Sequence, residues 1–95
     1  MSQYEALYII KPTVEEEERN ALMEKFSALV TGAAGQVVKV EPWGRRRLAY
    51  LIDDFSEGFY VLMNFESEPD FPKELERNFR INDQIIRYMI INTNE

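Results

Sequence analysis

Two periods of apolar residues alternate along the chain, and together they predict six elements. Runs rich in aromatic and β-branched residues are typical of strands, whereas apolar residues that recur every three or four positions are typical of helices. The predicted strands cover residues 4–10, 37–52, 59–65 and 85–91. The predicted helices follow the first and third strands, so the order is β-α-β-β-α-β.

The two predicted helices carry recognisable start and stop signals. Thr13 and Glu16 have the spacing of a capping box at the start of the first helix, and Gly32 and Gly35 end it. The apolar face of this helix comprises Val14, Leu22, Phe26, Leu29 and Ala33. Asp70 can cap the second helix, with proline in its first turn. The apolar face of the second helix comprises Phe71, Leu75 and Phe79.

The second predicted strand is long and contains an interruption. The segment Pro42-Trp43-Gly44 disfavours a regular ladder, so we expect a bend or bulge there. Residues 53–58 are rich in Asp, Ser and Gly and predict the turn into the third strand.

Right-handed crossovers fold this element order into the ferredoxin-like split βαβ architecture. We therefore expect an α+β fold, with one domain over residues 1–95, a four-stranded antiparallel sheet, and both helices on one face. Strand alternation directs one set of side chains toward the helices: Ala6, Tyr8, Ile10, Val61, Met63, Phe65, Tyr88 and Ile90. It directs another set toward the open face: Leu7, Ile9, Tyr60, Leu62, Met89 and Ile91. An apolar face of this size predicts a partner or a covering segment.

The distribution of charge adds a candidate binding site to this fold. The chain has a formal net charge of -6, yet residues 39–50 carry Lys39 and three adjacent arginines against a single acid. Arg45, Arg46 and Arg47 stand between Trp43 and Tyr50, and arginines beside aromatic rings suit phosphates and stacked bases. The alternative is a solvated strand. Because side chains alternate along a strand, the three arginines cannot all reach one target.

The sequence gives little support to catalysis. It contains no histidine and no cysteine, and it has no glycine-rich phosphate loop. The four consecutive glutamates at 15–18 fan out around a helix and are best explained as its solvated start. We therefore expect no enzyme activity, no cofactor and no metal. No apolar run is long enough to span a bilayer, and the N-terminus lacks the basic region of a signal peptide, which favours a cytoplasmic protein.

RNA-recognition motifs share this element order and offer an alternative function. Residues 7–10 resemble their strand-one signature, and residues 58–61 partly resemble the strand-three signature. Two features weaken the match. Glu57 stands where a basic residue is expected, and Tyr8 falls on the helix-facing side, where it could not stack on a base.

A set of short segments spread along the chain forms a recognisable pattern: Tyr4-Glu5, Pro12, Gly35 with Val37, residues 43–50, Gly58-Phe59-Tyr60, and residues 79–83 with Arg87. In these segments the chain resembles the bacterial small-subunit ribosomal protein S-six family, over essentially all of its residues. The most specific of these is Gly44 followed by residues 46–50. Leu51 departs from the pattern, because many members have proline there.

The resemblance implies a structural protein of the small ribosomal subunit that binds the central domain of its rRNA together with the small basic ribosomal protein S-eighteen. The residues that we expect to contact RNA or the partner are Tyr4, Trp43, Arg45, Arg46, Arg47, Tyr50, Arg80 and Arg87. An ion pair, for example of Arg80 with Asp83, is the alternative for the last two. A second class of function is a protein-only adaptor, which would dock a chain on the open face and leave the arginines idle.

Overall fold

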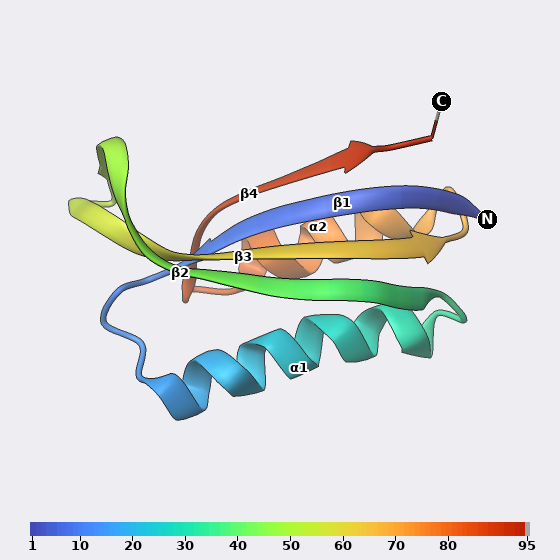
Figure 1. Ribbon diagram of the computed structural model, residues 1–95, viewed down its shortest axis with the longest axis horizontal. Helices are drawn as coiled ribbons and strands as arrows, with labels where there is room; N and C mark the ends of the chain where they lie inside the picture. Colours follow the sequence, from blue (N-terminus) through green and yellow to red (C-terminus); the bar gives the residue numbers. More distant parts are fainter. Residues whose placement is uncertain (95) are drawn as a thin grey trace.

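The computed structural model describes residues 1–94 and contains six elements in the predicted order (Figure 1). The strands are β1 (Ser2–Ile10), β2 (Gln36–Ile52), β3 (Phe55–Ser67) and β4 (Ile85–Asn92). The helices are α1 (Glu16–Gly32) and α2 (Phe71–Ile81).

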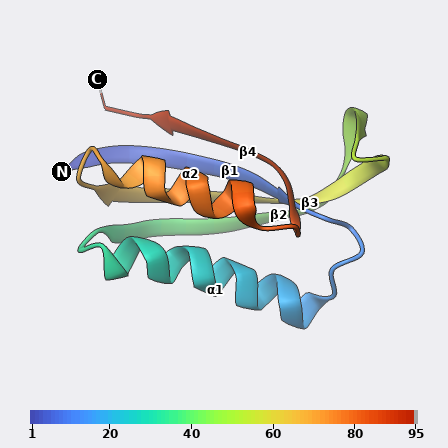
Figure 2. The same cartoon turned by 180° about the vertical axis from the view of Figure 1, so that it is seen from behind.

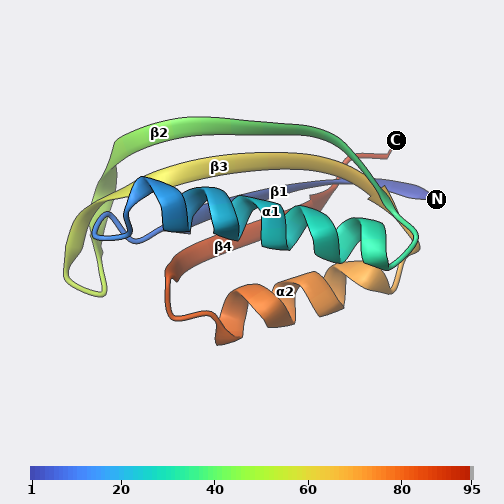
Figure 3. The same cartoon turned by 90° about the horizontal axis from the view of Figure 1, so that it is seen from below.

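The four strands form one antiparallel sheet in the order β2-β3-β1-β4. Both helices lie on the same side of this sheet, as Figure 2 and Figure 3 show from two directions. The predicted α+β, ferredoxin-like class is therefore confirmed. The other side of the sheet is the open face, and its edges are β2 and β4.

The core lies between the sheet and the helices and is rich in aromatic rings. Tyr8 on β1 packs against Phe26 of α1 and Phe79 of α2, with ring centroids 5.1 and 5.0 Å away. Complete burial of such a ring stabilises the fold by about 1.5–3 kcal/mol. The predicted helix-facing residues are all buried or partly buried in this core: Ala6, Tyr8, Ile10, Val61, Met63, Phe65, Tyr88 and Ile90.

The Tyr8 side chain is fully buried, so it cannot stack on a base. Its hydroxyl has no hydrogen-bond partner within residues 1–94. Burial raises the pKa of this hydroxyl well above its ordinary value, because the phenolate form would lose its hydration. The geometry of β1 therefore disagrees with recognition in the manner of an RNA-recognition motif.

Both helices begin differently from the sequence prediction. Helix α1 starts at Glu16 with Glu15 at the N-cap, so the capping box at Thr13 is wrong. Val14 lies before the helix, where its buried side chain joins the core and its carbonyl accepts a hydrogen bond from Arg19. Asp70 occupies the predicted N-cap of α2, but its side chain makes no capping hydrogen bond. Acidic residues in each first turn still suit the helix dipole.

Strands β2 and β3 continue past the end of β1 and form a projecting hairpin (Figure 1). The predicted turn at residues 53–58 is too long, because only Asp53 and Asp54 connect Ile52 to Phe55. Both aspartates have positive φ, as a two-residue hairpin turn of type I′ requires, and Asp tolerates that conformation. The hairpin bends over the open face.

This bend changes the predicted open face. Ile9 was expected to be exposed on that face, but it is only 5 % exposed. It packs under Gly58 of β3, where the hairpin crosses β1. The expected covering segment is therefore supplied in part by the chain itself. Met89 and Ile91 on β4 remain exposed.

Candidate nucleic-acid interface

Trp43 reaches the open face because the ladder between β2 and β3 is interrupted. The register shifts between Pro42 and Gly44, which confirms the predicted bulge, and Gly44 adopts a φ of 85° that favours glycine. The Trp43 ring stacks on Tyr60 of β3, with centroids 6.2 Å apart and an interplanar angle of 11°. The bulge thus turns an aromatic pair toward the solvent.

Arg46 continues this stack. Its guanidinium carbon lies 5.0 Å from the centroid of the Trp43 ring. Arg46 is paired across the ladder with Gly58, so no side chain opposes it on β3. The result is an Arg46–Trp43–Tyr60 array with a cation at one end, a composition that suits both phosphates and base faces.

A second cation and ring pair joins the hairpin to the opposite edge of the sheet. Arg87 on β4 lies over the Tyr50 ring, 5.5 Å from its centroid, and donates a hydrogen bond to the Tyr50 hydroxyl. Tyr50 is 59 % exposed, so its ring is also accessible from outside. A guanidinium has five N–H donors, which leaves most of those of Arg87 available to a ligand.

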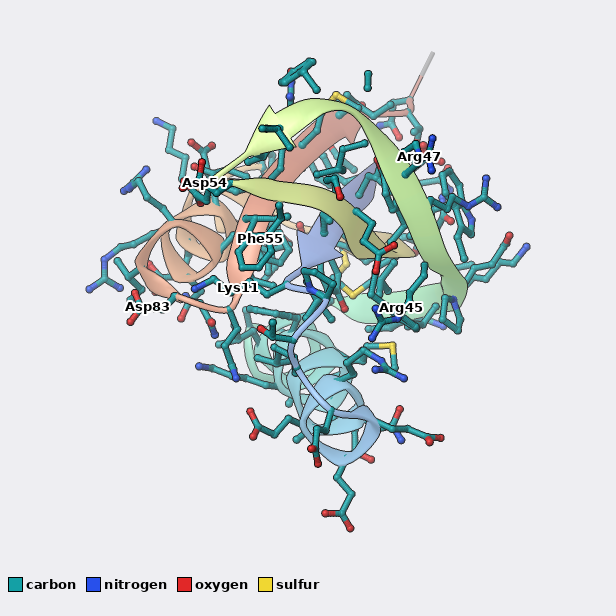
Figure 4. The ribbon with its side chains drawn as sticks, turned by 90° about the vertical axis from the view of Figure 1, so that its left-hand side faces the viewer. Lys11, Arg45, Arg47, Asp54, Phe55 and Asp83 are labelled. Carbon is teal, nitrogen blue, oxygen red and sulfur yellow. The ribbon has the colours of Figure 1, made fainter. Side chains whose placement is uncertain are left out.

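The other two adjacent arginines have different surroundings. Arg45 forms an ion pair of 2.8 Å with Glu57 and donates a hydrogen bond of 2.8 Å to the carbonyl of Pro12, which lies in the β1–α1 connection. Arg47 is exposed and forms no ion pair with the described residues 1–94. Figure 4, which looks along the sheet from the hairpin end, shows Arg45 and Arg47 at separate points along β2. Arg46 is paired with Gly58, between the pairs of Arg45 with Phe59 and of Arg47 with Glu57, so strand alternation directs Arg46 to the other side from Arg45 and Arg47, as expected.

Two predicted site residues lie away from this group. Tyr4 is 8 % exposed and stacks on Phe65 in the core, with centroids 5.5 Å apart. Arg80 is exposed on α2, on the other side of the sheet, and pairs with Glu76 at 3.7 Å. The suggested pairing of Arg80 with Asp83 is wrong, because Asp83 follows the end of α2 and the acid one turn earlier takes its place.

The bent hairpin lines a cavity of about 460 Å³ that is open to solvent and lies against β1 and β4. Its floor and walls are mostly apolar or aromatic, and it carries one cation. The lining residues are Leu7, Ile9, Leu48, Ala49, Tyr50, Ile52, Tyr60, Arg87, Tyr88 and Met89.

Charge is divided along the open face. The hairpin end carries Arg46 and Arg87, neither of which forms an ion pair within residues 1–94. Farther from the hairpin, the face carries the acids Glu5 and Glu66, which are cross-strand neighbours of Asn64 and Gln3. Glu41 lies nearer the array, where its carboxylate pairs with Lys39 at 2.9 Å and accepts a hydrogen bond from Trp43. A hydrogen bond from Lys39, and then the charge of its ammonium, lower the pKa of Glu41 and keep it ionised.

Comparison with known proteins shows to which family the chain belongs. The family model for ribosomal protein S6 matches residues 3–92. The small ribosomal subunit protein bS6 of Desulforamulus reducens is 53% identical over 95 residues, which is the full length of both chains. That of Caldanaerobacter subterraneus is 47% identical over the same length. The crystal structure of 30S ribosomal protein S6 from Thermotoga maritima superposes with a TM-score of 0.91 at 36% identity, covering 96% of this chain and 86% of that one.

The chain belongs to the ribosomal protein S6 family. Members of the S6 family are structural proteins of the small ribosomal subunit, so the chain is a ribosomal protein and not an enzyme. RNA binding and a place in translation follow from that membership. Within residues 1–94, no group of three or more acids could hold a metal ion, and no helix is long and apolar enough to cross a membrane.

Two features of the open face of this S6 family member were not predicted from the sequence: the stacking of Tyr60 on Trp43 and the burial of Leu48. Tyr60 was assigned to the open side, but its stacking on Trp43 depends on the register shift, which no spacing rule specifies. Leu48 is buried only because the hairpin bends back. The unusual length of β2, at 17 residues, is the one sequence-level signal for that bend, because such strands are rarely straight.

Proposed function

We propose that this protein binds the central domain of small-subunit rRNA together with the small basic ribosomal protein S-eighteen, on the cytoplasmic ribosome. The hairpin end of the open face supplies the RNA contacts. The remainder of that face supplies the contacts with the basic partner.

The observation that supports this proposal best is a group of arginines without carboxylate partners. Arg46, Arg47 and Arg87 form no ion pair within residues 1–94, although acids outnumber cations in the chain. Two of these guanidinium groups lie over aromatic rings. Cations held in this way are ready to meet phosphates, since no ion pair has to break first.

The net charge of -6 explains why a partner is needed. Most of the surface repels phosphate, so a local patch binds RNA weakly on its own. A basic protein placed beside Glu5 and Glu66 neutralises the acidic end of the open face. The two proteins then present a joint cationic surface to the RNA.

The decisive experiment is a salt titration of an rRNA central-domain fragment with both proteins. The double variant Arg46→Ala/Arg47→Ala should bind more weakly and show a smaller dependence on salt, by about 0.9 in the log–log slope for each lost phosphate contact. Lys25→Ala/Arg77→Ala removes the same charge from the helices and is the matched control. Equal losses in the two double variants, or no loss in either, contradict the proposal.

The exposed apolar residues Met89 and Ile91 favour a second candidate, a protein-only adaptor. Such an adaptor would dock a chain on β4 without any RNA-dependent step. The same titration separates the two functions, because an adaptor would bind its partner with or without rRNA and would give no protein-dependent retention of the RNA.

A further inference from the structure

We propose that the cavity beneath the hairpin receives one unstacked nucleobase of single-stranded RNA. In this arrangement Tyr50 and Tyr60 flank the base, while Arg46 and Arg87 contact the phosphates on either side of it. This inference rests on the proposed function and specifies which kind of RNA element the open face recognises.

The dimensions and lining of the cavity suit a planar ring. Its volume of about 460 Å³ lies in the range of pockets that hold small ligands. Leu7, Ile9 and Leu48 line it with aliphatic groups, and the last two are almost fully buried. Tyr50 and Tyr60 add two aromatic rings, from the hairpin tip and from the centre of the sheet. A nucleobase buries both of its faces favourably between groups of this kind.

The two arginines distinguish a nucleotide from an apolar protein side chain. Arg87 lines the cavity, and Arg46 lies on the neighbouring Trp43–Tyr60 stack. An aliphatic side chain would fill the cavity but would cover cations and give them no anion, which is unfavourable. A nucleotide brings a phosphate on each side of its base, so its charge matches that of the cavity rim.

The shape of the site also selects the form of the RNA. The cavity is lined by β2 of the hairpin on one side and by β4 on the other. A base within a duplex is stacked on its neighbours and cannot enter such a space. Bases in loops and bulges can turn outward, and proteins commonly recognise them by stacking and by their exposed edges.

Two variants test the site and keep both arginine residues, although Tyr50→Leu also removes the ring and the hydroxyl that Arg87 contacts. Tyr50→Leu removes one aromatic wall and keeps the apolar character. Ala49→Trp places a large ring at an exposed position on the cavity lining. Leu51→Ala is the matched control, because Leu51 is exposed on the same hairpin and does not line this cavity. Thermal unfolding first establishes that all three variants fold.

The affinity of each variant is measured for the central-domain rRNA fragment in the presence of the basic partner. Loss of one stacked base should weaken binding by about tenfold in Tyr50→Leu and Ala49→Trp. The control should change by less than about twofold. In the wild-type protein, the methyl resonances of Ile9 and Leu48 should shift on addition of a ten-nucleotide single-stranded RNA, and a ten-base-pair duplex should leave them unchanged.

The results separate this inference from the proposed function. If wild-type protein retains rRNA while both cavity variants bind as tightly and the methyl resonances do not move, the inference is wrong and the proposed function stands. Methyl shifts caused by the partner protein alone also overturn it, because the occupant is then a protein side chain. Failure of the wild-type pair to bind rRNA at all overturns both.

Discussion

Replacing Gly58 with alanine tests the packing that holds the hairpin over the open face. Gly58 is buried where β3 crosses β1, and it faces Arg46 across the ladder. A Cβ atom added there would lie 2.3 Å from Cγ2 of Ile9 and 3.5 Å from Cδ1 of Ile86. Ile9 cannot turn away cheaply, because branching at Cβ restricts its χ1 rotamers. The hairpin must therefore lift from β1.

Overpacking of this kind costs about 1–3 kcal/mol. Loss of glycine entropy from the unfolded chain offsets about 0.4–1 kcal/mol of that cost. We expect Gly58→Ala to lower the free energy of unfolding by about 1–2 kcal/mol, since the packing cost exceeds the entropic gain. In a domain of this length, each kcal/mol lowers Tm by roughly 4–8 °C.

Urea unfolding followed by circular dichroism measures this loss, and the fluorescence of Trp43, the only tryptophan, reports on the hairpin in the same samples. Gly32→Ala is the matched control, because a Cβ at this last residue of α1 meets nothing within 4 Å. The control should be stabilised by about 0.4–1 kcal/mol. A Gly58→Ala protein as stable as wild type, or a control that loses as much, would refute the packing argument.

Three further substitutions probe the core and the surface. Tyr8→Phe should raise the free energy of unfolding by about 1 kcal/mol, since it removes a buried hydroxyl without a partner in residues 1–94. Burial raises the pKa of Tyr8, so the free energy of unfolding of the wild-type protein is unaffected by this group below about pH 10 and falls as the pH rises further. Urea titrations up to pH 11 should therefore show a shallower decline of the free energy of unfolding in the variant. Phe79→Ala should cost about 3–5 kcal/mol in the same assay, and a cost below 1 kcal/mol would contradict the described core. Arg45→Ala should cost less than about 1 kcal/mol at low salt, because its ion pair with Glu57 is about half exposed, and a larger loss would show that this pair stabilises the hairpin.

Much of the fold could be predicted from the periods of the apolar residues. Alternation along β1 and β3 placed Tyr8 and Val61 on the helix side, and both are fully buried there. Capping was less predictable, because Thr13 has the right spacing for a capping box but lies three residues before the first helical turn. Which side chain can reach the free backbone N–H groups of the first turn depends on the path of the segment before the helix, and the local sequence does not specify that path.

The sequence was enough to predict which residues form the candidate site, but not how these residues pair with one another. Trp43, Arg46, Tyr50 and Arg87 were all named from the sequence, and the structure brings them to the same end of the open face. Their pairing into two cation and ring stacks depends on the bulge near Gly44 and on the bend of the hairpin. Both are tertiary effects, and a linear pattern cannot show which residues a bend brings together.

Tyr4 was predicted to belong to the site but lies apart from it. Its ring lies in the core against Phe65. An aromatic residue at the start of a strand suits either role, because the same ring can fill a core or stack on a base. Its contribution to RNA binding stays a prediction.

Whether the hairpin end of the open face contacts RNA is tested most directly by crosslinking this chain to central-domain rRNA, with and without the small basic partner, and identifying the crosslinked peptides. We expect crosslinks to the segment of residues 43–50 and to Arg87 on β4 when the partner is present, and much weaker ones without it. Crosslinks confined to α1 and α2, or equal in strength with and without the partner, would show that the hairpin end of the open face is not the RNA-binding site.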